Sequence, residues 1–199
     1  MIRFFSKILI FALTIFILFI GYFAYFGFTT SKFNKIIKDQ IKKQNNDLDI
    51  ELKKIKLHLN LKNISIKIKT KNPKIILSNS HYLEIDEISS NISISSYFQD
   101  KFVVKDLSIK SKKNEIERYI DFYKINNKNT FQILLLKKAL KRGKAQINVD
   151  LYFDDFGKIK NDYILTGKVS DTDLIIPQNI KQLKFDFTIK NNNYKFEKI

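Results

Sequence analysis

Few residues in this sequence have the side-chain chemistry that catalysis or metal binding requires. The chain has no cysteine, which excludes disulfides, thiolate nucleophiles and cysteine metal sites. His58 falls in the polar register of an alternating stretch and His81 in a predicted loop, and neither has a second ligand at metal-binding spacing. We therefore interpret both as solvated histidines and expect neither a metal ion nor a cofactor.

The remaining candidate for a cation site is the pair Asp154 and Asp155, close to Gly157. Aspartate and glycine are also the usual residues of hairpin turns, and we favour the turn. The five glycines of the chain form neither a phosphate-binding loop nor a nucleophile elbow. Glycosylation sequons at Asn63 and Asn91 fall in predicted strands, where a chance match is the simpler interpretation. We therefore expect a protein that is not an enzyme.

The positive charge of the chain could indicate an anionic partner. The 199 residues carry a formal net charge of +16, which would suit nucleic acid or an anionic membrane surface. Only Arg3, Arg118 and Arg142 are arginines, however, so the forked guanidinium groups that bind phosphate are scarce. The abundance of lysine, isoleucine and asparagine is typical of an AT-rich genome. We do not expect nucleic acid as a partner.

An apolar segment near the N-terminus predicts a membrane span. Ile8 to Phe28 contains no charged residue, and as a helix it would be about 31 Å long, which matches a hydrocarbon core of about 30 Å. Aromatic residues crowd its far end, as they do at a membrane interface. The segment is too long for a cleavable signal peptide and lacks a small-residue cleavage site. We predict an uncleaved single-pass anchor at residues 1–30.

Charge alone does not orient this anchor. Lysines follow the span as well as precede it, so a literal count of positive charges would keep the rest of the chain in the cytoplasm. Long domains are translocated largely regardless of charge, and lysine is frequent throughout the chain. We therefore expect residues 31–199 to be exported.

A short amphipathic helix is predicted at residues 31–46, directly after the anchor. Ser31 can cap it, and its apolar residues recur at helical spacing with lysines between them: Phe33, Ile36, Ile37 and Ile41. Two placements fit this pattern. The helix could lie on the membrane surface, or it could pack on its own domain.

A β-rich domain is predicted at residues 47–199, because the apolar period changes to two at about Asp47. Within it, the alternation of Ile55 to Thr70 changes phase at Lys62-Asn63. A two-residue hairpin loop there, or a bulge at Asn63, would keep one face apolar. The hairpin would make three apolar pairs: Leu61 with Ile64, Leu59 with Ile66, and Leu57 with Ile68.

A helical pattern interrupts these strands near residues 115–142. Four residues recur at helical spacing in its first half: Ile116, Tyr119, Ile120 and Tyr123. A second helix is predicted from about Thr130, with lysine and arginine in its last turns and Gly143 as its stop. Strand patterns then return, from Ile147 to Phe153 and from Leu183 to Ile189. The predicted fold class is therefore mainly β with a few helices.

The order of these segments resembles the N-terminal region of the AsmA-like family of inner-membrane-anchored envelope proteins. Three features carry the resemblance: an L-x-L-x-N-I-S-I core at 59–66, a Leu-x-Ile-x-x-Ile unit at 83–88, and Ile-Ser-Ile at 92–94 leading to V-x-D-L-S-I at 104–109. The stretch 147–174 is similar to the strand-turn-strand units along those proteins. AsmA-like proteins are usually several times longer, so we expect a short member or the first part of a longer product.

The resemblance implies an elongated, curved antiparallel β-groove, of the β-taco or chorein-like kind, anchored in the bacterial inner membrane with its domain in the periplasm. Such a groove would shield phospholipid acyl chains on their way to the outer membrane. At about 4.8 Å per strand, eight to ten strands would extend roughly 40 to 50 Å, so a partner or self-assembly would be needed to bridge an envelope. The candidate lining residues are Leu57, Leu59, Leu61, Ile64, Ile66, Ile68, Ile92, Ile94, Leu107, Ile109, Val149, Leu151, Phe153, Phe185, Phe187 and Ile189.

Three alternatives stay open at this point. The first is a lipopolysaccharide-transport subunit of the LptC type, which predicts a regular jelly roll without helices at 115–142. The second is an envelope assembly scaffold that binds a protein partner by strand addition. In the third, the apolar rows pack on the two helices as a closed core.

Overall fold

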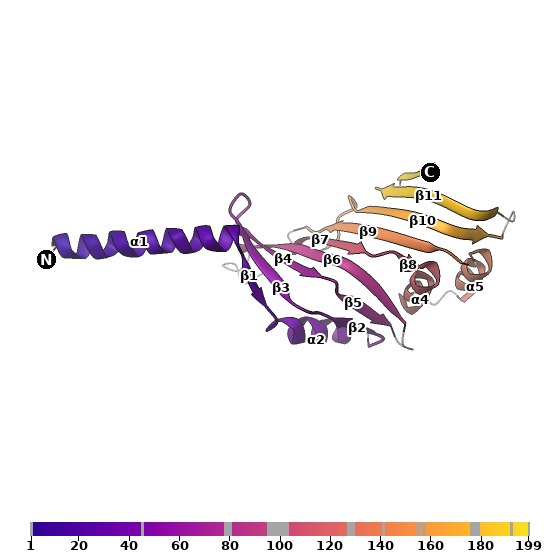
Figure 1. Ribbon diagram of the computed structural model, residues 1–199, viewed down its shortest axis with the longest axis horizontal. Helices are drawn as coiled ribbons and strands as arrows, with labels where there is room; N and C mark the ends of the chain where they lie inside the picture. Colours follow the sequence, from indigo (N-terminus) through magenta and orange to yellow (C-terminus); the bar gives the residue numbers. More distant parts are fainter. Residues whose placement is uncertain are drawn as a thin grey trace.

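A large antiparallel sheet and four helices make up the part of the chain that the structure describes (Figure 1). The computed structural model describes residues 2–44, 46–77, 81–94, 104–126, 130–140, 142–154, 156, 158–175, 180–191 and 193–198. The sheet is curved and does not close on itself. These features confirm the mainly β class with a few helices.

Helix α1 (Ile2–Tyr25) is the predicted apolar helix. Its segment Phe4–Tyr25 has a mean hydropathy of 2.5 and is not buried in the protein, so by length and composition it is suited to cross a membrane. The predicted end at Phe28 is wrong, because Gly27 takes a positive φ of 70° and ends the helical segment. Phe28 instead begins strand β1 (Phe28–Thr30), which pairs with the sheet.

Helix α2 (Asn34–Gln44) follows β1 and begins later than the predicted cap at Ser31. The backbone N–H of Lys32 donates to the Thr30 hydroxyl at 3.1 Å, and the N–H of Asn34 donates to the Ser31 carbonyl at 3.0 Å. These bonds form a turn before the helix. The Asn34 side chain then donates to the carbonyls of Leu52 and Lys53 at 3.0 and 2.9 Å, which fixes the start of α2 to the domain.

The remaining strands are β2 (Leu48–Glu51), β3 (Ile55–Asn60), β4 (Ser65–Lys71), β5 (Lys74–Leu77), β6 (Tyr82–Ser93), β7 (Val104–Ser111), β8 (Asn114–Glu115), β9 (Lys144–Tyr152), β10 (Ile164–Leu174), β11 (Ile180–Lys190) and β12 (Asn193–Lys198). Their main order is β1-β3-β4-β6-β7-β9-β10-β11-β12. β5 pairs with β6 and carries β2 on its other side, while β8 pairs with β9. Neighbours in this order are mostly consecutive strands, as expected for a sheet built from hairpins.

The hairpin of β3 and β4 has the predicted register. Leu57 pairs with Ile68 and Leu59 with Ile66, but the last pair is Asn60 with Ser65. The connecting turn is therefore residues 61–64 rather than Lys62-Asn63 alone. The Asn60 side chain accepts a hydrogen bond from the N–H of Lys62 at 3.1 Å and so helps the chain to leave the ladder early.

Helices α4 (Ile116–Asn126) and α5 (Thr130–Ala139) lie between β8 and β9 in the sequence. Ile116, Ile120, Ile133 and Ala145 form a buried cluster between these helices and the sheet. The LptC-type alternative predicts a jelly roll without helices at 115–142, so the presence of α4 and α5 differs from that prediction. Helix α5 ends before the predicted stop at Gly143, because Leu140 instead makes a β-bridge with Leu174.

Candidate functional site

The register of the sheet brings apolar residues from nearly all its strands onto one face. Residues that lie directly opposite each other in an antiparallel ladder project from the same side. The longest such row runs across the sheet from β3 to β12 through Ile55, Thr70, Ile88, Ile109, Val149, Leu165, Ile189 and Tyr194. We call this side of the sheet the apolar face.

Most of the predicted lining residues belong to the apolar face. By their pairing these are Leu57, Leu59, Ile66, Ile68, Ile92, Leu107, Ile109, Val149, Leu151, Phe185, Phe187 and Ile189. Leu61 and Ile64 lie instead in the β3–β4 turn, and Ile94 follows the end of β6. Phe153 follows β9 and bridges to Ile159. Alternation with a period of two correctly predicted which strand residues share the apolar face. The positions of residues at strand ends depend on turn geometry, which the alternation does not show.

The apolar face is only half-buried. All the predicted lining residues that pairing places on it are partly exposed. The buried apolar side chains among the described residues lie on α4, α5 and β9 or on β2, β3, β5 and β6: Ile50, Ile55, Leu77, Leu83, Ile85, Ile116, Ile120, Ile133 and Ala145. Over the described part of the chain, the helices therefore leave much of the apolar face open.

Part of the apolar face forms one wall of a pocket of about 670 Å³. The pocket is also lined by Ile37 and Ile41 of α2, by residues of β2, and by Ile75 of β5. Phe122 of α4 also lines it. The wall from the sheet includes Ile55, Ile68, Ile88, Ile92, Val104, Leu107 and Ile109. The volume lies in the usual range of ligand pockets, about 300 to 1,000 Å³.

Ion pairs hold helix α2 over this pocket. The Asp49 carboxylate on β2 accepts from Lys38 at 3.0 Å and lies 3.5 Å from Lys42. Burial acts to raise the pKa of Asp49, but the Lys38 ammonium, the N–H of Ile50 and the Lys42 charge outweigh it, so that pKa lies below its usual value. Asp49 is therefore a fixed anion that ties α2 to the sheet beside the apolar wall.

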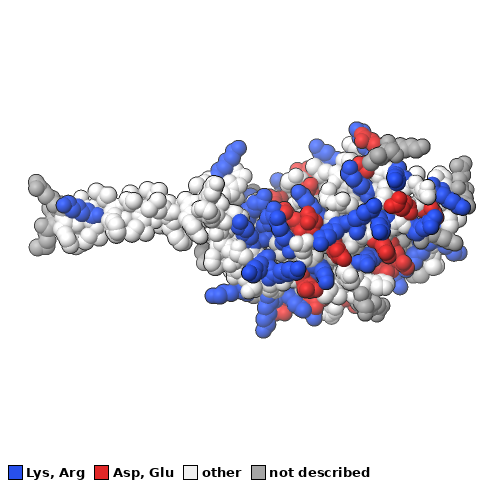
Figure 2. Space-filling view, in the orientation of Figure 1, with Lys and Arg blue, Asp and Glu red and all other residues white. Residues whose placement is uncertain are grey.

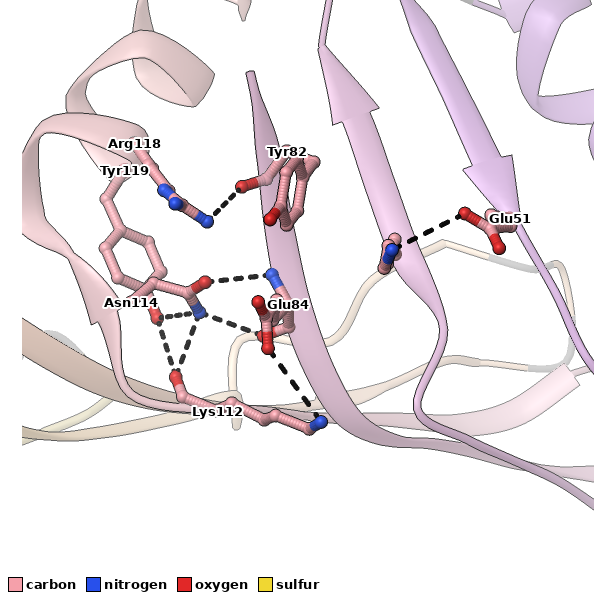
Figure 3. A network of polar contacts seen from close by, with 8 residues as sticks. Glu51, Tyr82, Glu84, Lys112, Asn114, Arg118 and Tyr119 are labelled. Carbon is pink, nitrogen blue, oxygen red and sulfur yellow. Dashed lines mark hydrogen bonds and ion pairs between the residues drawn. The ribbon is translucent and has the colours of Figure 1, made fainter. Parts of the chain in front are cut away.

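Asn114 on β8 joins β6 to the start of α4 (Figure 3). Its side-chain oxygen accepts from the N–H of Glu84 at 2.8 Å, and its amide nitrogen donates to the Glu84 carbonyl at 2.9 Å. The buried amide thus pairs with β6 as a strand residue would. Sequence reasoning missed Asn114, because no local pattern shows that Glu84 lies opposite.

Tyr119 extends this network under α4. Its hydroxyl lies 2.6 Å from the Ser111 hydroxyl and donates to the Ala145 carbonyl at 3.2 Å. Burial raises the pKa of Tyr119, so the hydroxyl keeps its proton. Nearby, Arg118 donates to the Tyr82 carbonyl at 3.2 Å, and its guanidinium carbon lies 4.7 Å from the centre of the Tyr82 ring. These contacts fix α4 on the sheet.

The opposite side of the sheet is polar and rich in lysine. His58 pairs with Lys67, and Lys56 pairs with Lys69, so four basic side chains project from neighbouring positions. Burial lowers the pKa of His58, and the charges of the three lysines lower it further. Figure 2 shows lysine and arginine side chains gathered on the end of the domain next to α1. The sheet thus separates an apolar side from a cationic side.

The residues considered for metal binding have structural roles. Among the residues described, no group of three or more metal-ligating side chains is close enough to hold an ion. His81 is not simply solvated, because it lies 2.6 Å from Asp121, which also pairs with Lys137 at 3.0 Å. Asp154 accepts from the N–H groups of Phe156 and Lys158, both at 2.9 Å, as the turn interpretation predicts. Asp155 and Gly157 lie outside the described residues.

No family model, curated protein or solved structure matches this chain. The resemblance to the AsmA-like family therefore stays a prediction from the sequence.

Proposed function

We propose that this chain is a membrane-anchored, non-catalytic protein that shields phospholipid acyl chains in a groove formed by the apolar face of its sheet. The observation that carries the proposal is the apolar face, which is continuous from β3 to β12 and only half-buried. A soluble domain normally buries such a face, since large exposed apolar surfaces mark binding sites or aggregation. An acyl chain is a ligand that can cover a long and narrow surface of this kind.

The energetics favour a lining of this length. Burial of one methylene is worth about 0.8 kcal/mol, so a chain of roughly 15 methylenes would cost on the order of 12 kcal/mol to carry through water. The nine strands of the main order, spaced about 4.8 Å apart, present a face roughly 40 Å long. This length supports binding of an extended acyl chain along the face.

The apolar helix α1 supports the membrane part of the proposal. We place it across the bacterial inner membrane and the sheet in the periplasm, where the protein would contribute to assembly or maintenance of the outer membrane. A groove next to an anchor can exchange lipid with the bilayer that holds it. The orientation follows from the expected export of residues 31–199.

A second candidate function, an assembly scaffold, is favoured by the outer edge of the sheet. β12 pairs with β11 on one side, and it is the last strand in the order of the sheet. Tyr194 and Phe196 on this strand are each 66% exposed. An edge strand with exposed aromatic residues is a site where a strand of a partner protein can add.

Photo-crosslinking in the full-length chain tests the lipid proposal. A benzoyl-phenylalanine at Leu107, on the apolar face, should form an adduct with phospholipid that mass spectrometry identifies. The same probe at Ser108 points to the polar side and serves as the matched control. Phospholipid adducts at 107 but not at 108 support the groove.

Two results would contradict the lipid groove. Equal labelling at both positions would mean that lipid contact is not specific to the apolar face. A protein adduct at position 107 without lipid, together with protein adducts at Tyr194, would favour the scaffold.

A further inference from the structure

The turn between β3 and β4 exposes two large apolar side chains at its ends. Leu61 is 58% exposed and Ile64 is 64% exposed, with Lys62 and Asn63 between them. Neither side chain belongs to the half-buried rows of the apolar face. An exposed pair of this kind at the tip of a hairpin suggests contact with something outside the chain.

Ile64 also has an unusual backbone conformation for its residue type. Its φ is 44°, in the left-handed region that β-branched residues rarely adopt. Asparagine or glycine would occupy this position with less strain, so the isoleucine is not explained by the turn itself. A role for the apolar side chain beyond the turn would explain why it stands there.

The turn lies at the end of the sheet where α1 joins it. Phe28 pairs with Leu57 and Thr30 with Ile55 in antiparallel register. Because β1 runs away from the end of α1, β3 runs back toward it. Gly27 lies against the Leu57 carbonyl and the His58 ring. Leu61 is four residues beyond Leu57 in the direction of the anchor, about 13 Å along an extended strand. Figure 1 shows the turn beside the C-terminal end of α1.

The surroundings of the turn match a membrane surface. The aromatic end of α1 is exposed, with Tyr25 at 81% and Phe26 at 56%. Lys62 is in the turn itself, and Lys67 is exposed on the polar side of β4. Apolar residues flanked by lysines are the combination that binds the interface of a bilayer with anionic lipid.

We infer that the Leu61–Ile64 turn is a second membrane contact, in which Leu61 and Ile64 insert into the interface of the bilayer that α1 spans. This inference rests on the proposed membrane anchoring. The apolar row Leu59–Ile66 directly follows the turn, and Ile92 and Val104 continue it across the sheet. The contact would thus place one end of the apolar face against the acyl chains of the bilayer.

The chain offers a clean reporter for this contact, because it contains no tryptophan. Leu61→Trp in the full-length protein places a single indole in the turn. Reconstitution into phosphatidylethanolamine vesicles with phosphatidylglycerol, some carrying lipids brominated near the headgroup end of the acyl chain, measures contact by quenching. We expect the emission of this variant to shift to the blue and to lose most of its intensity in brominated vesicles.

Phe131→Trp is the matched control. Phe131 on α5 is 69% exposed, and Figure 1 shows α5 at the end of the domain far from α1. Its emission should be insensitive to bromine. Quenching of the Leu61→Trp variant no stronger than that of Phe131→Trp would overturn the inference.

A second substitution separates membrane contact from folding. Ile64→Asn in the Leu61→Trp background removes an apolar group and relieves the positive φ, so the thermal midpoint should stay equal or rise. Quenching should nevertheless fall at least twofold. A variant that keeps full quenching would contradict the role given to Ile64.

The two proposals fail separately. Lipid crosslinks at Leu107 without quenching at position 61 would remove the second contact and leave the groove. Quenching at position 61 without lipid crosslinks at Leu107 would leave a membrane-docked domain that does not carry lipid.

Discussion

Gly143 occupies a place in the fold that no side chain can share. Its φ is 131°, and a β-carbon there would overlap the side chain of Thr172, which is fully buried. Next to it, Arg142 pairs with Asp173 at 2.6 Å. The close approach of these two segments joins the end of α5 to β10, and it requires glycine at 143.

Gly143→Ala should therefore lower the free energy of unfolding by about 2 kcal/mol or more, because both the backbone conformation and the contact are strained. Thermal unfolding of the full-length protein in detergent, followed by circular dichroism, measures the loss. Gly21→Ala is the control, since outside the backbone of its own helix and its chain neighbours no heavy atom lies within 4 Å of the added carbon. Equal midpoints for the two variants would contradict a tight contact between Gly143 and Thr172.

His58 predicts a dependence of stability on pH. Burial and then the neighbouring lysines lower its pKa below the ordinary value of 6.5. The unfolded chain therefore binds the proton more tightly than the folded chain does. The contribution of neutral His58 to the free energy of unfolding is complete above pH 6.5, and it is lost as pH falls through the folded-state pKa. His58→Gln should flatten the stability curve in that window. Denaturant unfolding across mildly acidic pH measures it, and an unchanged slope would contradict the assignment.

At the scale of elements, Asn114 is the joint between β6 and α4. Asn114→Ala removes the side-chain hydrogen bonds to Glu84, Lys112 and Tyr119, and it leaves the N–H and carbonyl of Glu84 without these partners. We expect a loss of about 2 to 3 kcal/mol in unfolding free energy, measured by denaturant titration. Asn161→Ala, at an exposed turn, should change it by less than about 0.5 kcal/mol. A neutral effect at 114 would show that α4 is held by its apolar contacts alone.

Elements with a clear period could be predicted from the sequence. Alternation and the position of the phase change predicted the pairing of Leu57 with Ile68, because the centre of a hairpin determines its register. The length of its turn could not be predicted, since turns of two and four residues about the same centre leave that register unchanged. The helical spacing of Ile116 and Ile120 likewise predicted α4 and its buried side.

Elements at junctions were harder to predict. Phe28 continues an apolar run, and hydropathy alone does not distinguish the last turn of a span from the first residue of a strand. The start of α2 depends on bonds from Asn34 to carbonyls at Leu52 and Lys53. Asn114 pairs with a residue 30 positions away. Such contacts are set by tertiary structure and have no local signal.

At the scale of the whole molecule, a lysine introduced on one side of the sheet should affect lipid binding, whereas a lysine introduced on the other side should not. Leu107→Lys places an ammonium group on the apolar face, where a charge in a lipid environment costs roughly 3 kcal/mol. Under the proposed lipid function, lipid affinity should fall by about 100-fold, and phospholipid should not co-purify with this variant. Quantitative mass spectrometry of the purified protein measures this.

Ser108→Lys places the same group on the polar side, where Ser108 pairs with Asp150. We expect this variant to retain its phospholipid. Loss of lipid from both variants would indicate a general effect on the fold, and retention by both would contradict binding on the apolar face.

The unclosed sheet has a consequence for how such a protein can change in evolution. Within the main order each strand pairs with its neighbours, and antiparallel pairing keeps opposite residues on the same side. Duplication of one hairpin, such as β9 with β10, would therefore insert two strands and lengthen the sheet by about 10 Å. No existing side chain would have to change sides. Duplication of the gene segment that encodes a hairpin can thus lengthen the sheet without changing the contacts within the existing strand pairs.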